Sequence, residues 1–308
     1  MTGAKTTGAR EGTLKPYDLA TGGADYPPWT EPLPARTFLL CSTPRCGSTL
    51  LGEALYAAGG MGCPLEYFHR GFRPAFACRW GAPDDASYRR AVYRYRTDPT
   101  GSLGVKLFWD DLLTLCAATY PEVAALVEVD SESDARAAAR LFQGARETAA
   151  DLFPEPSWIF LARRDRLRQA VSAHIAKQTQ LFRWYPGGEG APLREARYDY
   201  DAIARAYAYA IRSGAAWERF FAAAGIVPHR LLYEELADDY AGSIRALMRA
   251  LGRQGAPIPP PRLRRQSSAL SEQFLIRFLR EQARRAAHDA TDALPPSIPT
   301  GMPVGKRR

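Results

Sequence analysis

The stretch LLCSTPRCGSTLL, residues 39–51, decides the fold of this 308-residue chain. An apolar run ends in turn residues around Gly47, and a helical pattern begins at Ser48. A strand that leads directly into a helix N-terminus points several backbone N–H groups at one place, where the helix dipole favours negative charge. Arg45 adds a bidentate cation, and the hydroxyls of Ser48 and Thr49 add donors. The stretch therefore predicts an anion site, with an ordinary strand–turn–helix capped by Ser48 or Thr49 as the alternative.

The same stretch differs from the phosphate loop of conventional ATP and GTP phosphotransferases. A Walker A loop reads G-x-x-x-x-G-K-[ST], whereas Arg45 and Cys46 precede the only glycine of this stretch and no lysine follows it. The compact loop suits one 5′-phosphoryl-type group better than a triphosphate.

Outward from this stretch, short apolar runs alternate with helical patterns. The expected strands are residues 37–42, 103–109, 158–162 and 230–233, and the helices that follow them are residues 48–58, 112–118, 165–181 and 237–251. Two further helices are expected at residues 199–224 and 271–286. This alternation predicts an α/β fold in which a central parallel sheet is flanked by helices.

A second basic motif follows the third expected strand. Arg164 stands at the carboxyl end of that strand, where open α/β sheets bind ligands, and Ser172 lies eight residues further on in the next helix. An arginine and a serine in this arrangement can share a second anion. A solvated basic helix face is the alternative for this motif. Together, the two motifs predict a ligand with two separated anionic groups, such as a nucleotide phosphorylated at both the 5′ and 3′ positions.

Composition excludes several classes of protein. Hydrophobic residues make up 46% of the chain and aromatic residues 11%, which is too much for a largely disordered protein. No apolar run approaches the roughly 18 residues of a membrane span, so no stable membrane insertion is expected. The net charge of +8 favours anionic partners. Five cysteines without a C-x-x-C pair, and only four histidines, predict no disulfide framework and no metal, and favour a cytoplasmic location.

The chain is predicted to form one domain between two flexible ends. Residues 1–34 are rich in Gly, Thr and Pro and show no periodicity, and residues 286–308 are Pro-rich and end in basic residues. The folded domain is therefore expected over residues 35–285. The Gly- and Pro-rich residues 185–192 are expected to form a surface loop of the kind that often lies beside a site.

Taken together, the motifs resemble the two signatures of PAPS-dependent sulfotransferases (PAPS is 3′-phosphoadenosine 5′-phosphosulfate): a 5′-phosphosulfate loop, and an arginine followed eight residues later by a serine. More specifically, residues 37–285 resemble the bacterial trehalose 2-sulfotransferase family. The segments that carry this resemblance are Pro44–Leu51, Gly62–Phe68 with the pattern G-x-P-x-E-[WYF]-F, Gly104–Trp109, and Arg163–Thr179. The resemblance implies a P-loop-like sulfotransferase fold.

The resemblance also implies transfer of a sulfuryl group from PAPS to a carbohydrate hydroxyl by in-line displacement. It implies that Glu66 is the base that takes the hydroxyl proton, and that Arg45 is a catalytic cation that stabilises the leaving phosphate. The residues implied to bind PAPS are Arg45, Cys46, Gly47, Ser48, Thr49, Arg164 and Ser172. Those implied to contact the acceptor are Glu66, Lys106 and Trp109.

The chain departs from its relatives at several positions. Phe108 stands where cytosolic sulfotransferases have the histidine of a K-x-H pair, which favours Glu66 as the base and leaves His69 as the alternative. Trp109 either stacks on a sugar ring or belongs to the core. Cys63 stands where the family often has an acidic residue suited to sugar hydroxyls, and the Ala-rich residues 129–150 are extra. Both departures leave the acceptor open between trehalose and other glycosides, nucleoside antibiotics or glycolipids.

Two other functions remain open at this stage. One is a P-loop-type small-molecule kinase, which the missing lysine disfavours. The other is a non-catalytic basic module that binds nucleotides or RNA, and such a module does not require a carboxylate such as that of Glu66. For the sulfotransferase, the expected partners are a small carbohydrate acceptor and a second copy of the chain in a homodimer, with no nucleic acid.

Overall fold

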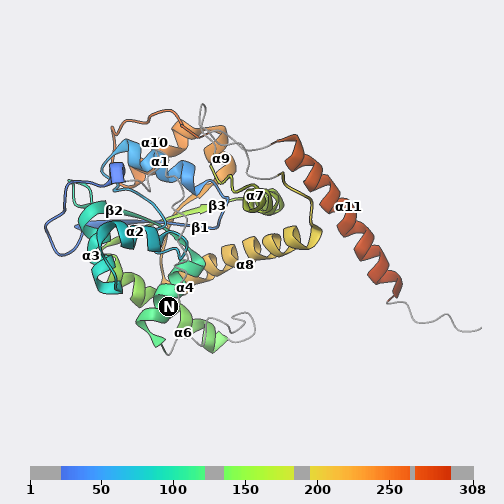
Figure 1. Ribbon diagram of the computed structural model, residues 1–308, viewed down its shortest axis with the longest axis horizontal. Coiled ribbons are helices and arrows are strands. Elements are labelled where there is room, and N and C mark those ends of the chain that lie inside the picture. The colour runs from blue at the N-terminus through green and yellow to red at the C-terminus, as the bar shows by residue number, and fades with distance from the viewer. Residues whose placement is uncertain (1–21, 122–134, 184–194, 264–267, 293–308) are drawn as a thin grey trace, which may run out of the picture.

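The computed structural model describes residues 22–121, 135–183, 195–263 and 268–292. Its centre is a parallel sheet of four strands in the order β2-β1-β3-β4. The strands are β1 (Arg36–Ser42), β2 (Ser102–Phe108), β3 (Pro156–Ala162) and β4 (His229–Leu232). Helices lie on both faces of the sheet (Figure 1). The predicted α/β fold with a parallel sheet flanked by helices is therefore confirmed.

The two faces of the sheet follow from the alternation of side chains along each strand. In β1, Leu39 and Cys41 belong to one buried cluster, and Phe38 and Leu40 belong to another. The helices of the first cluster are α3 (Asp85–Arg96), α4 (Trp109–Thr119), α6 (Ala135–Leu152) and α8 (Tyr200–Ala224). Those of the second are α1 (Ser48–Ala58), α9 (Tyr233–Asp238) and α10 (Tyr240–Ala250). The short α2 (Arg73–Trp80) and the 3-10 turn η1 (Gly22–Ala24) also contribute to the first cluster, through Phe76 and Ala24.

A third, smaller cluster joins the helices beyond the sheet. It holds α7 (Arg166–Thr179) and α11 (Ala269–Asp292) against one end of α8. Phe274 and Phe278 are the buried anchors of α11, and the rest of this helix runs away from the body of the molecule (Figure 1). The helix ends at Asp292, beyond the predicted end at Ala286.

Several element boundaries differ from the sequence prediction for identifiable reasons. Trp109, predicted as the last residue of a strand, begins α4, because the Asp111 carboxylate accepts a hydrogen bond from the Phe108 N–H at 3.2 Å. The single helix predicted over residues 237–251 is instead two, since the Asp239 carboxylate accepts from the Gly242 N–H at 2.9 Å and starts α10 there. Each carboxylate caps a new helix N-terminus.

Three helices were not predicted, namely α2, α3 and α6. Helix α6 covers most of the Ala-rich stretch at residues 129–150, and its Leu141, Ala145 and Ala149 pack into the core. Residues 129–134, the loop predicted at 185–192, and most of the two predicted tails lie outside the described residues.

The order of the strands places the two predicted anion motifs side by side. The chain runs from β1 to β2 on one side and then crosses to β3 on the other side of β1. The carboxyl ends of β1 and β3 therefore flank a topological switch point, where doubly wound sheets bind ligands. The loop after β1 carries Arg45, and the start of α7 after β3 carries Arg163 to Ser172.

Candidate active site

The loop between β1 and α1 has a backbone that only certain residues accept. Gly47 has φ 89°, and a Cβ atom at this position would lie 2.5 Å from the Tyr233 ring. Glycine is therefore required both for the conformation and for the close approach of the ring. Arg45 also has a positive φ, 66°, which is a costly conformation for a residue with a side chain. Such strain is maintained only where surrounding contacts hold the loop.

Those contacts come from α7 and from the residues that connect β3 to it. Gln169 donates hydrogen bonds to Thr43 Oγ1 and to the Pro44 carbonyl, each at 2.6 Å. Arg45 Nε donates to Ser172 Oγ at 3.1 Å, and Arg163 Nη1 donates to the Arg45 carbonyl at 3.1 Å. The two motifs, more than 100 residues apart in the chain, are thus joined directly.

A cavity of about 500 Å³ opens between these motifs. Its floor is the β1–α1 loop, with Gly47, Ser48 and Thr49 in the lining, and Ser172 stands on the α7 side. Among the described residues that line it, the charged ones are Arg45, Arg163, Arg168, Arg183 and Glu272. This size is typical of a small-molecule site, and the excess of arginines suits a polyanionic ligand.

Two arginines of the cavity have pKa values below the ordinary range. Burial and the neighbouring guanidinium of Arg163 lower the pKa of Arg45 to about 10. Burial also lowers the pKa of Arg163, whose guanidinium carbon lies 4.6 Å from the centre of the Tyr233 ring. Two adjacent, desolvated arginines gain electrostatic energy from a bound phosphate or sulfate.

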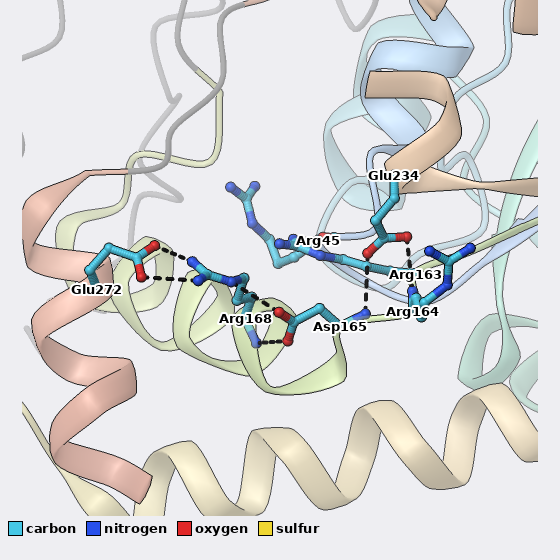
Figure 2. Close-up of polar contacts among 7 residues, drawn as sticks. All are labelled: Arg45, Arg163, Arg164, Asp165, Arg168, Glu234 and Glu272. Atoms are coloured by element: carbon cyan, nitrogen blue, oxygen red, sulfur yellow. Dashed lines mark hydrogen bonds and ion pairs between the residues drawn. The ribbon is translucent and has the colours of Figure 1, made fainter. Parts of the chain in front are cut away.

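Arg164 lies outside this cavity, contrary to its predicted place in the site. Its side chain is 68% exposed and approaches the Glu235 carboxylate at 3.7 Å. The backbone N–H groups of Arg164 and Asp165 both donate to the Glu234 carboxylate, at 3.0 and 3.1 Å, and Figure 2 shows the Arg164 side chain directed away from Arg45. The arginine at the end of β3 that does line the cavity is Arg163.

An ion pair between two helices forms the rim of the cavity. Arg168 of α7 makes a bidentate contact with Glu272 of α11, and its Nε lies 3.0 Å from the Asp165 carboxylate (Figure 2). The side chains of Arg168 and Glu272 are 39% and 43% exposed. Helix α11 is therefore tied to the cavity at its first turn.

Glu66 is placed by an unusually close backbone contact. Gly62 has φ 65°, and a Cβ atom there would lie 2.2 Å from the Gly104 nitrogen, so the chain before Glu66 presses against β2. Leu65 then pairs with Val105 as a parallel bridge, and the Lys106 N–H donates to the Leu65 carbonyl at 2.9 Å. Glu66 consequently lies beside Lys106.

The two side chains form a buried ion pair. Lys106 Nζ lies 2.5 Å from Glu66 Oε1 and donates to Thr49 Oγ1 at 3.4 Å. Burial alone raises the pKa of Glu66, but the charges of Lys106 and Arg183 outweigh it and hold the pKa below its usual value. Glu66 Oε2 is buried and has no hydrogen-bond partner among the described residues. A carboxylate that is ionised and has one unpaired oxygen can accept a proton from a hydroxyl group.

The other predicted residues occupy different surroundings. Cys46 is fully buried in the core and is not part of the cavity lining. Trp109 is 6% exposed and packs edge-on against Trp217 at 5.2 Å, with Phe142 and Phe220 nearby. Its position is that of a core residue, and stacking on a sugar stays a prediction without support from this position.

Position 63 faces the interior. The Cys63 sulfur lies 3.1 Å from Arg96 Nη1, and Arg96, whose side chain is fully buried, forms an ion pair with Asp25 at 2.9 Å. The side chain at this position therefore belongs to the core. His69, the alternative base, accepts a hydrogen bond at Nδ1 from the Gly71 N–H, and burial lowers its pKa.

Sequence reasoning missed Arg163, Gln169, Arg168, Tyr233 and Glu272 as residues of the site. Arg163 and Gln169 lie in the motif that identified Arg164 and Ser172. The available signal was the alternation of side chains at the end of a strand, because only one of two successive arginines can face the neighbouring loop. Tyr233 and Glu272 come from distant segments and carry no local signal.

Comparisons with known proteins agree with this geometry. Residues 37–281 match the model of the Stf0 sulphotransferase family, and the chain belongs to this family. It is 30% identical over 281 residues to a trehalose 2-sulfotransferase of Mycobacterium tuberculosis, an alignment that covers 81% of this chain and 96% of the relative. It is 26% identical over 275 residues to a trehalose 2-sulfotransferase of Mycolicibacterium smegmatis, with coverages of 80% and 96%.

Membership in this family decides between the functions that the sequence left open. The chain is a sulfotransferase, and the kinase and the non-catalytic binding module are set aside. In the part of the chain that the structure describes, no helix is long and apolar enough to cross a membrane. Within the same residues, no three His, Cys, Asp or Glu side chains are grouped as metal ligands.

Proposed function

We propose that this sulfotransferase uses PAPS as the donor and transfers its sulfuryl group to a hydroxyl of a carbohydrate by in-line displacement. PAPS supplies an activated sulfuryl group together with PAP, the adenosine 3′,5′-bisphosphate, as its leaving group. The single observation that carries the proposal is the joining of the β1–α1 loop and the α7 motif around one arginine-lined cavity. A nucleotide with phosphates at both ends requires two such groups of donors at one site.

The residues of the cavity suit such a nucleotide. The backbone N–H groups of residues 46–49, at the N-terminus of α1, and the Arg45 guanidinium would hold the 5′-phosphate. Ser172 and Arg163 would hold the 3′-phosphate, with Arg163 in the role that the sequence pattern assigned to Arg164. The left-handed conformation of Gly47 and the close Tyr233 ring fix the shape of this loop.

Glu66 is the proposed base. Its ionised carboxylate, with Oε2 unpaired among the described residues, would accept the proton of the attacking hydroxyl. Arg45 would stabilise the negative charge that develops on the leaving phosphate. Lys106 contacts both the proposed base, Glu66, and Thr49 of the loop that would bind the 5′-phosphate.

The proposed acceptor is a trehalose-like sugar or another glycoside, including a glycolipid head group. Support comes from the two relatives, both of which are trehalose 2-sulfotransferases.

The test separates donor binding from chemistry. The thermal midpoint should rise most with PAP, less with AMP and ATP, both for the wild type and for Glu66→Gln. With radiolabelled PAPS and a panel of sugars that includes trehalose, Glu66→Gln should lower turnover by about 10²–10⁴-fold. Stabilisation by ATP equal to that by PAP would overturn the donor assignment, and normal turnover of Glu66→Gln would remove Glu66 as the base.

A further inference from the structure

Lys106 is an uncommon feature in the middle of a buried strand. Its side chain is 1% exposed, and its neighbours along β2 are Val105 and Leu107. Among the described residues, the ammonium group has two oxygen partners, Glu66 Oε1 at 2.5 Å and Thr49 Oγ1 at 3.4 Å. A buried ion pair is weak evidence for stability, because well-packed apolar side chains fill the same space at least as favourably. The position of Lys106 therefore calls for a role in the reaction.

Lys106 connects two parts of the site. Thr49 lines the anion cavity, whereas Glu66 lies behind it and is not part of the lining. Lys106 contacts both, so one positive charge acts on the carboxylate and on any phosphate held beside Thr49. A phosphate that attracts this ammonium group weakens the ion pair between Lys106 and Glu66.

We propose that Lys106 is a positioning residue that couples donor binding to the base, by holding Glu66 through the ion pair and the β1–α1 loop through Thr49. This inference rests on the proposed function of Glu66 and of the cavity. Lys106 fixes the orientation of the carboxylate and directs Oε2 away from itself. When the donor binds, its phosphates attract the Lys106 ammonium group and weaken the ion pair with Glu66. The Glu66 carboxylate then becomes a stronger base when the acceptor hydroxyl must lose its proton.

Several charged groups act on Glu66 in addition to Lys106. Arg183, which follows α7, acts in the same direction as Lys106, and Asp111 on α4 acts in the opposite direction. His69 lies in the same segment as Glu66. Lys106 is the cation in direct contact, so its removal should change the titration of Glu66 more than that of Arg183 would.

The experiment follows the Glu66 carboxyl group directly and needs no acceptor. In protein labelled with ¹³C at the glutamate carboxyl carbons, the Glu66 signal is identified by its loss in Glu66→Gln. In the wild type, PAP should raise the apparent pKa of Glu66. In Lys106→Met, the pKa without PAP should be at least one pH unit higher than in the wild type, and the further shift with PAP should be largely lost. Lys106→Arg should restore the low pKa.

A matched variant tests the link to the loop. Thr49→Val removes only the hydroxyl group, so Glu66 should keep its low pKa while the shift caused by PAP becomes smaller. If Lys106→Met does not fold, the double variant Lys106→Met/Glu66→Gln should, because it leaves no unpaired charge; binding of PAP is then measured on that protein and should be weaker than for Glu66→Gln alone.

Two results would overturn the inference: an unchanged Glu66 pKa in Lys106→Met, or the same PAP-induced shift in Lys106→Met as in the wild type. Equal PAP affinities of the double variant and of Glu66→Gln would also contradict it. Failure of the proposed function is a separate result, namely full turnover by Glu66→Gln. The titration can therefore contradict the role of Lys106 while Glu66 remains the base. Equally, the turnover of Glu66→Gln can exclude Glu66 as the base while the titration behaves as expected.

Discussion

Two ion pairs stand at opposite ends of the same site, and they differ in their access to water. Lys106 and Glu66, behind the β1–α1 loop, have side chains that are 1% and 8% exposed. Arg168 and Glu272, at the rim between α7 and α11, are 39% and 43% exposed (Figure 2). The rim pair has the better geometry, with two parallel contacts, yet water and salt screen it. Burial, more than the number of contacts, decides what each pair does.

The largest expected effect is the loss of the buried cation. Lys106→Met leaves the Glu66 carboxylate buried without its direct counter-charge and should lower the free energy of unfolding by about 3–5 kcal/mol at neutral pH. Lys106→Met/Glu66→Gln should recover most of this loss, which a double-mutant cycle of urea denaturation measures. Arg168→Met is the matched control at the rim. If Lys106→Met lowered the free energy of unfolding no more than Arg168→Met does, burial would not distinguish the two ion pairs.

The second effect concerns a buried carboxyl group without a direct counter-ion. Asp111 is 5% exposed, and burial raises its pKa to about 7. The folded protein therefore keeps a proton that the unfolded chain releases above its ordinary pKa, so this group's contribution to stability declines as pH rises and levels off above about pH 7. The decline should amount to about 2–3 kcal/mol between pH 5 and pH 7 and should be absent in Asp111→Asn.

Urea denaturation at several pH values measures this slope. Asp110→Asn is the control, because Asp110 is the exposed neighbour on the same helix and bonds to the Tyr209 hydroxyl. The Glu66 contribution runs in the opposite direction, since its pKa is lowered, and it is lost as pH falls through that low pKa. An identical pH profile for Asp111→Asn and the wild type would show that Asp111 is ionised like a surface carboxylate.

The third effect distinguishes two successive arginines. Arg163→Met should weaken PAP binding by about 10–100-fold, as expected for the loss of hydrogen bonds to a charged group, and should weaken AMP binding less. Arg164→Met should change both affinities little, because its side chain lies outside the cavity. Calorimetric titration of both variants with both nucleotides makes the comparison. If Arg164→Met instead lost more affinity for PAP than Arg163→Met did, and lost it selectively for PAP over AMP, Arg164 would be the residue that binds the 3′-phosphate.

The smallest effect belongs to the rim. Glu272→Gln should cost no more than about 1 kcal/mol of stability, and high salt should remove most of the difference. Thermal melts at low and high ionic strength measure it. A large loss that does not depend on salt would mean that α11 is held to α7 by this pair, rather than by the packing of Phe274 and Phe278.

Much of the architecture could be predicted because its signals are local. The strand–loop–helix at residues 39–51 and the alternating apolar runs were enough for the parallel sheet, since backbone sterics and side-chain periodicity act within a few residues. Helices α2 and α3 were missed for the opposite reason. Their burial depends on side-chain packing between neighbouring segments, such as Tyr88 against Phe68 and Phe76 against Tyr67, which no periodicity within either helix reveals.

Some features of the candidate site could likewise be predicted from the sequence, and others could not. The loop with Gly47 and Arg45, the glutamate at position 66 and the motif after β3 were visible in the sequence as residue types at fixed spacings. Which of two adjacent arginines faces the cavity was not visible, because the backbone there is held by the carboxylate of Glu234, a residue from a distant segment.

The amino-acid sequence alone determined the class of fold, the family resemblance and the residue types available for binding an anion and accepting a proton. Only the tertiary structure decided that Glu66 contacts Lys106, that Arg163 replaces Arg164 in the cavity lining, and that Trp109 and Cys63 face the core. The physical reason is the range of the interactions. Propensity and periodicity act along the chain, whereas burial and ion pairing depend on which distant segments the folded chain brings within a few ångströms.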